Sequence, residues 1–224
     1  MLMKRCLITF MFVAMLSVYH AVADVNPYAE GNASRFRIGM NLQFTSHSSW
    51  QIDFGCHYML NPHVGVGGSI GGWRQYRSPI APSGPNWWVL RSDRHPSNVF
   101  LRPSVLFMTS ELFGIGNAGF GLSICPGLQI NVPHQRVTIE IANDWDYNDN
   151  VKVSTTKGEW IAGDCRAGIF MHAGPVYVHA GYVVSTLNIY GMYRHLEYDD
   201  ISFKTFYPHS GWLQGGYVTV SYNF

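Results

Sequence analysis

Charged side chains occur singly inside stretches in which apolar and polar residues alternate. Three arginines, three acids and two histidines fall on the polar side of these stretches. They are Arg37, Asp53, His57, Arg102, Glu140, Asp164, Arg166 and His179. Because alternate residues of a strand point to opposite faces, these groups share one face. Charges removed from water persist only when they are paired and hydrogen-bonded, so we predict an ion-pair network adjoined by the two histidines.

No combination of serine, histidine and acid has the spacing of a catalytic set. His179 and Ser185 share a face, but six residues of strand separate them by about 20 Å. His209 and Ser210 are neighbours, and neighbours point in opposite directions in extended chain. The Gly-x-Ser-x-Gly and His-Glu-x-x-His motifs are missing from the sequence. We therefore predict that the protein is not an enzyme.

The sequence also predicts neither a metal site nor a cofactor. The acidic run at 143–150 alternates like a calcium loop, but an EF-hand starting at Asp144 would need Gly and Glu where the chain has Asp149 and Thr155. Beyond the first 23 residues the cysteines are Cys56, Cys125 and Cys165, whose spacing fits no zinc or redox motif. Free thiols are the favoured interpretation, and one disulfide with a leftover thiol is the alternative.

The N-terminal 23 residues have the features of a cleaved signal peptide. Lys4 and Arg5 precede an apolar run at 6–18, and Ala21-Val22-Ala23 is a small-x-small cleavage motif directly before Asp24. We expect a mature domain at 24–224. Removing the two basic residues leaves 13 basic against 14 acidic residues, a charge of −1. This balance argues against a nucleic-acid partner.

Alternation of apolar and polar residues recurs along the whole mature chain and predicts an all-β protein. Nine candidate strands follow from it, at 36–45, 50–60, 64–73, 98–108, 118–130, 136–147, 160–171, 176–187 and from about 211. Single-chain bacterial membrane barrels have even strand numbers. Either one candidate does not span, or a tenth strand lies near 87–91 or 192–198. We predict a closed antiparallel up-and-down barrel, favouring eight strands within a range of eight to ten.

Alternation alone does not say which face of a barrel is inside. A soluble lipocalin-type barrel buries its apolar face around a ligand, whereas a membrane barrel turns it towards lipid. Here the polar face carries mainly glycine, amide and hydroxyl side chains with single charges, and only 13% of the chain is charged. This composition favours a transmembrane barrel with a largely plugged lumen.

The C-terminal strand supports the membrane interpretation. In 215–224 the residues Val218, Val220, Tyr222 and Phe224 form an apolar face. This strand resembles the closing strand of bacterial outer-membrane barrels. The mature chain is similar to the small OmpA/OmpX type and to the broad outer-membrane β-barrel domain group. The resemblance implies location in the bacterial outer membrane, contact with its lipid, and recognition of the last strand by the barrel assembly machinery.

Three long connections, at 77–96, 148–158 and 191–211, are the candidate binding segments, and the first contains the exposed-looking pair Trp87 and Trp88. The resemblance implies a structural or adhesive role, or binding of an extracellular ligand through these loops. A minor porin for small solutes is the alternative. A lipid-modifying barrel enzyme, such as a lipid A deacylase or acyltransferase, is less favoured.

Overall fold

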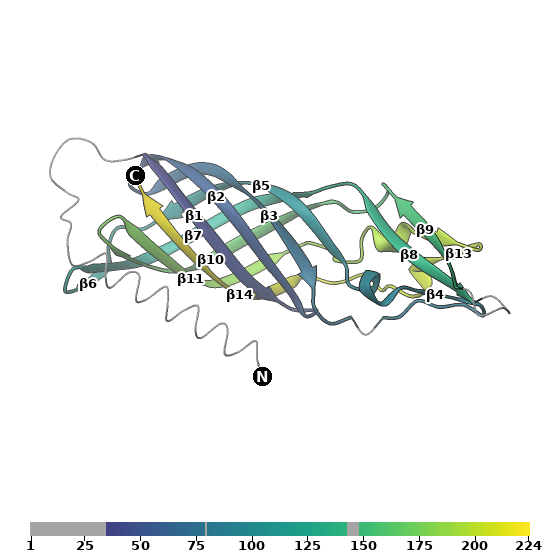
Figure 1. Ribbon diagram of the computed structural model, residues 1–224. Helices are drawn as coiled ribbons and strands as arrows, with labels where there is room; N and C mark the ends of the chain where they lie inside the picture. Colours follow the sequence, from purple (N-terminus) through teal and green to yellow (C-terminus); the bar gives the residue numbers. More distant parts are fainter. Residues whose placement is uncertain (1–34, 79, 143–147) are drawn as a thin grey trace.

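Eight antiparallel strands form a closed barrel in the computed structural model, which describes residues 35–78, 80–142 and 148–224 (Figure 1). The barrel strands are β1 (Phe36–Thr45), β2 (Ser49–Asn61), β3 (Val64–Gln75), β5 (Ser97–Met108), β7 (Ala118–Asn131), β10 (Ile161–Ala173), β11 (Val176–Ser185) and β14 (Leu213–Asn223). Each pairs with the next barrel strand along the chain, and β14 pairs with β1. The sheet therefore closes on itself, as predicted.

The barrel wall is apolar outside and polar inside. On β1, Arg37 is 4% exposed, whereas the next residue, Ile38, is 49% exposed. The same inversion runs around the wall, where large apolar side chains are exposed on six further strands: Phe54, Ile70, Leu101, Leu122, Ile169 and Tyr222. A soluble barrel would hide these side chains, whereas a wall in contact with lipid exposes them. The inward polar face excludes the lipocalin-type alternative.

The two ends of the barrel differ in the length of their connections. Turns at 62–63 and 174–175 and a hairpin formed by β6 (Phe113–Ile115) with β7 lie at the end that also holds the C-terminus (Figure 1). At the other end, only β1 and β2 are joined tightly, by a turn in which His47 and Ser48 have positive φ. The three remaining connections at this end are long.

These long connections fold together into one structure, here called the cap (described residues 76–78, 80–96, 132–142, 148–160 and 186–212). Strands β4 (Trp87–Val89), β8 (Gln135–Ala142) and β9 (Asn148–Thr155) form a three-stranded sheet in it. The last connection contributes the short strands β12 (Glu197–Tyr198) and β13 (Ile201–Ser202). Three 3-10 turns complete it: η1 (Arg91–Arg94), η2 (Tyr193–His195) and η3 (Phe203–Thr205). No helix in the described part of the chain is long and apolar enough to cross a membrane.

The cap has a hydrophobic core of its own. Val89, Val137, Ile139, Leu196 and Phe203 are fully buried there. The Trp87 ring stacks on Phe203 with 6.1 Å between ring centroids. This core continues into the barrel mouth, where it includes Trp73, Phe100 and Leu213 from three barrel strands. The cap is therefore packed onto the barrel and covers its opening.

The cap accounts for the ninth candidate strand. The described part of the candidate at 136–147, residues 136–142 of β8, does not span the wall, because its alternating Val137 and Ile139 are buried against other parts of the cap, and residues 143–147 lie outside the described residues. The segments 87–91 and 192–198, predicted as possible positions of a tenth strand, contain β4 and β12, which are also in the cap. Trp87, expected to be exposed, is 3% exposed. Period-two alternation marks a half-buried strand and does not identify the surface that buries it.

Candidate functional site

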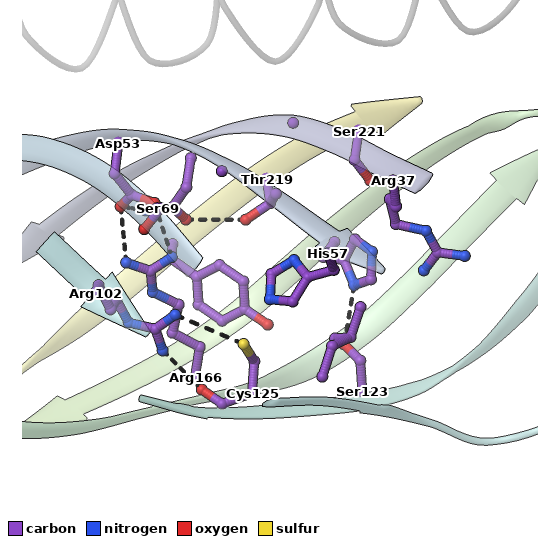
Figure 2. Close-up of a pocket in the computed structure, with 16 residues that line it drawn as sticks. Arg37, Asp53, His57, Ser69, Arg102, Ser123, Cys125, Arg166, Thr219 and Ser221 are labelled. Carbon is purple, nitrogen blue, oxygen red and sulfur yellow. Dashed lines mark hydrogen bonds and ion pairs between the residues drawn. The ribbon is translucent and has the colours of Figure 1, made fainter. Parts of the chain in front are cut away.

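The lumen is divided into layers, and its middle layer is ionic. The predicted residues Arg37, Asp53, His57, Arg102, Arg166 and His179 line one small cavity there, with a volume of about 60 Å³ (Figure 2). They come from β1, β2, β5, β10 and β11, so the closed sheet brings together positions that are far apart in the sequence. A cavity of this size holds a few water molecules, which need polar partners such as these.

Asp53 and Arg166 form the first ion pair across the lumen. Nη2 of Arg166 lies 2.7 Å from Oδ2 of Asp53, and Nη1 lies 3.3 Å from Oδ1. Asn41 also donates a hydrogen bond to Oδ2 of Asp53, at 2.9 Å. Both charged groups are buried. The two hydrogen bonds between them and the third from Asn41 compensate for the free-energy cost of removing the charges from water. The pair joins β2 to β10.

Arg102 and Asp164 form the second ion pair. Nε of Arg102 donates to both oxygens of Asp164, at 2.8 and 2.9 Å. Its Nη2 donates to the backbone carbonyl of Cys125 at 2.8 Å. Gly127 makes room for this side chain, because an added Cβ would lie 2.5 Å from Cζ of Arg102. Nε of Arg166 lies 3.7 Å from Asp164, so the two pairs form one chain of four charges.

Arg37 and the two histidines flank this chain. The Arg37 guanidinium lies 3.7 Å from the centroid of the Tyr177 ring, and its Nη1 is 2.6 Å from Sδ of Met108. Nε2 of His57 is hydrogen-bonded to Ser104, and Nδ1 of His179 to Ser123, each at 3.0 Å. Figure 2 shows His57 and Arg37 on the same side of the cavity, away from Asp53.

Buried apolar side chains pack in the lumen on both sides of the ionic layer. Towards the short-turn end, Met59, Leu106, Met108 and Phe170 are buried against one another. Towards the cap, Trp73 donates a hydrogen bond to Asn131 (2.8 Å) and belongs to the core that continues into the cap. Trp73 therefore faces inward. The ionic layer therefore lies between two clusters of buried apolar side chains.

Glu140 is the one predicted network residue that lies elsewhere. It is on β8 in the cap, opposite Trp88 of β4, and it accepts a hydrogen bond from the Trp88 indole. The alternation over 136–147 predicts a spanning strand with Glu140 in the lumen, but β8 belongs to the cap. The other acids, Asp53 and Asp164, do lie in the lumen, so the described lumen layer contains three arginines and two aspartates.

Several hydrogen-bond partners of the network are not among the residues predicted from the sequence. The hydroxyls of Ser104 and Ser123, the amide of Asn41 and the carbonyl of Cys125 are all used. The serines and Asn41 occupy alternate positions on the same inward faces, so the two-residue period predicts that they face the lumen. Which group each contacts depends on register between strands, which one chain does not reveal.

The described residues contain no catalytic constellation that is open to a substrate. Ser123 contacts His179, but in that part of the chain no carboxylate is hydrogen-bonded to this imidazole, and both side chains are buried. The hydroxyl of Ser210 donates a hydrogen bond to Oδ1 of Asn188, while Nε2 of His209 lies 3.5 Å from Oε1 of Glu159. No group of three or more potential metal ligands occurs among the described residues. Cys56, Cys125 and Cys165 are free, and the strongest acidic candidates at 143–147 lie outside the described residues.

The wall and lumen geometry decide the type of barrel, because exposed apolar side chains surround a buried ionic layer. The fold is that of a small bacterial outer-membrane β-barrel. The sequence itself matches no family model and no curated protein. Solved structures with a similar fold include Neisserial surface protein A, with 12% identity and a TM-score of 0.44 over 87% of this chain and all of the other.

Two other solved structures are similar over a comparable length. The N-terminal β-barrel domain of Pseudomonas aeruginosa OprF has 11% identity and a TM-score of 0.40, covering 86% of this chain and all of that one. A major outer membrane protein from Thermus thermophilus has 12% identity and a TM-score of 0.44, with 86% and 100% coverage. At such identities the likeness concerns the fold alone.

Proposed function

We propose that this protein is an integral outer-membrane barrel whose closed lumen is structural and whose cap presents a binding or adhesive surface outside the cell. The observation that carries the proposal is the cap core. Loops that merely join strands would not bury Val89, Ile139, Leu196 and Phe203 completely. A packed and rigid surface limits the entropy lost on binding a partner.

The closed lumen favours this role over that of a minor porin. A conducting path would need water from one end of the barrel to the other, whereas the ionic layer encloses about 60 Å³ between two apolar layers. The ion pairs hold β2, β5 and β10 together from within. In this proposal the network therefore stabilises the barrel from inside.

The proposed location follows from the two ends of the chain. Residues 1–23 would direct export and be removed, leaving 24–224 as a single barrel domain with outer-membrane lipid around it. Val218, Val220, Tyr222 and Phe224 would form the strand that the assembly machinery recognises. Val218 and Val220 are half-buried and Tyr222 and Phe224 exposed on the outer wall, where a factor could reach them. The cap would then face the cell exterior.

Shortening the cap while preserving the barrel tests this function. One variant replaces 77–96, 148–158 and 191–211 by short turns, and a matched control alters only the turn at 46–48. We expect cells carrying the control to adhere to epithelial monolayers and to fibronectin-coated or laminin-coated surfaces as the wild type does, and the cap variant to lose adhesion while its barrel remains folded. Equal adhesion of the two variants, or none by the wild type, would contradict the proposed role.

A lipid-modifying activity finds less support. The lumen histidines are bonded to serines inside a closed layer, where a phospholipid or lipid A headgroup would not fit. Lipid profiles of a deletion strain provide the check, and we expect them to be unchanged.

A further inference from the structure

A polar pocket of about 490 Å³ lies in the cap, between the base of the β8–β9 hairpin and the segment that enters β12. Its volume falls within the range of small-molecule sites. The lining consists of His134, Val153, Ser154, Thr155, Thr156, Lys157, His195 and Glu197. It is separate from the lumen cavity and shares no residue with it.

The walls of the pocket are held in place by contacts around it. Gln135, next to His134, donates a hydrogen bond to the hydroxyl of Tyr193 at 3.0 Å, which ties one wall to the other. Gly158, next to Lys157, has φ +121°, and an added Cβ there would lie 2.5 Å from the carbonyl oxygen of Gly191. The two segments therefore meet backbone to backbone beside the pocket, which makes it preformed.

The lining chemistry suits a phosphate group on a hydroxyl-rich ligand. Lys157 supplies an ammonium group, and His134 and His195 supply ring nitrogens, so three donors of the kind that bind phosphate surround the pocket. The hydroxyls of Ser154 and Thr156 and the carboxylate of Glu197 can bond to ligand hydroxyls. Val153 is the single apolar side chain of the lining, so an apolar ligand would be poorly matched.

The distance of the pocket from the cap end of the barrel wall indicates where such a ligand would come from. His134 lies three residues beyond the end of β7 at Asn131, and Lys157 lies four residues before β10 begins at Ile161. At about 3.3 Å per residue, the pocket is within roughly 13 Å of the upper rim of the wall. The wall just below exposes Leu128 and Ile161. In a membrane this is the layer of lipid headgroups.

We propose that this pocket binds the phosphorylated, hydroxyl-bearing headgroup of a membrane lipid at the rim of the barrel. The proposal rests on the proposed membrane location and orientation, and adds a defined ligand class to the cap. Lys157 would pair with the phosphate, and the hydroxyl and carboxylate side chains would hold the remainder of the headgroup.

Binding by the full-length protein tests the proposal in two arms. The soluble arm uses glucose 1-phosphate and inorganic phosphate with the protein in a phosphate-free detergent, measured by calorimetry. The lipid arm measures enrichment of phosphatidylglycerol over phosphatidylcholine around the protein in mixed vesicles. Lys157→Ala is compared with Lys152→Ala, a lysine of β9 outside the pocket. We expect Lys157→Ala to weaken glucose 1-phosphate binding about tenfold and to abolish lipid enrichment, and Lys152→Ala to stay within about twofold of the wild type.

Absence of saturable binding in both arms would overturn the proposal, as would equal losses in the two lysine variants. Binding of the soluble phosphates without lipid enrichment would overturn the assignment to a headgroup. Adhesion assays keep these outcomes distinct from the proposed function. Adhesion by the wild type without binding in either arm would overturn the pocket proposal alone, whereas failure of the adhesive role would leave headgroup binding unchanged.

Discussion

The guanidinium of Arg102 on β5 donates a hydrogen bond to the backbone carbonyl of Cys125 on β7, at 2.8 Å. This contact lies where the pairing of the two strands is interrupted. In β5, registered pairs with β7 are missing at 102–103 and 105–106, whereas β7 and β10 pair without a gap over 13 residues. Arg102 therefore ties together the least regular contact in the barrel wall.

Two prolines explain the interruption. Val132 N donates to Val99 O, and Thr109 N to Leu122 O, so the odd residues of β5 and the even residues of β7 point their backbone groups at each other. Pro103 and Pro126 occupy such positions, and proline has no N–H to donate. Each removes one hydrogen bond from the same contact between strands.

Restoring one of these donors should strengthen the wall. We expect Pro126→Val to raise the free energy of unfolding by about 1 kcal/mol relative to Pro62→Ala, measured by urea titration of heat-modifiable migration in gels. Pro62 lies in a turn and controls for the freedom that any lost proline gives the unfolded chain. Amide exchange at Leu128 should slow in the first variant only. Unchanged exchange there would show that the missing donor is not what weakens the contact.

The pair of Asp53 and Arg166 should be strongly coupled. Removing either charge leaves the other buried without its partner, so we expect Asp53→Asn and Arg166→Gln each to cost about 3–5 kcal/mol of stability. The double variant should cost less than the sum of the two, which a double-mutant cycle measures. Arg136→Gln, at an exposed position of β8, serves as the control. Additive losses would contradict a direct pair.

The cap core should fail independently of the barrel. Phe203 is fully buried and stacks on Trp87, so Phe203→Ala should destabilise the cap by about 3–5 kcal/mol. We expect limited proteolysis to cut the cap of this variant while the barrel stays heat-modifiable. Trp212→Ala removes an aromatic side chain that is 68% exposed, and should leave the cleavage pattern unchanged. Equal protease resistance of Phe203→Ala and the wild type would speak against a cooperative cap.

The cap should also loosen at alkaline pH. Burial raises the pKa of Tyr193 and of Tyr207 above the usual value for tyrosine, because the phenolate is disfavoured there. Since the folded-state pKa exceeds the unfolded value of about 10, the stabilisation is fully present below pH 10 and is lost as the pH rises further. Tyrosine absorbance near 295 nm should therefore titrate late, together with loss of near-ultraviolet circular dichroism. Titration of both residues near pH 10 without loss of structure would contradict this.

The barrel could be predicted from the sequence because its apolar and polar faces produce a two-residue alternation along each strand. Arg37 beside Ile38 is enough to show that one face is polar and the other apolar, and the same contrast recurs on the other strands. The inward positions of Asp53, Arg102, Asp164 and Arg166 follow from that alternation. Their pairing does not, because it depends on how distant strands are staggered when the sheet closes.

The cap could not be predicted, for a physical reason. Val137 and Ile139 alternate with polar residues as they would in a membrane strand, but they are buried by side chains from two other connections. Glu140 was misplaced for the same reason. Nothing in the local pattern separates burial by lipid from burial by Leu196 and Phe203, which lie about 60 residues further along the chain.

Electrical recording tests the closed lumen most directly. Full-length protein would be inserted into planar bilayers, with heat-modifiable migration verifying the folded barrel before recording. Because the ionic layer lies between two clusters of buried apolar side chains, we predict no steady single-channel conductance from the wild type. A steady, reproducible conductance of the folded wild-type barrel would contradict the account and favour the minor porin.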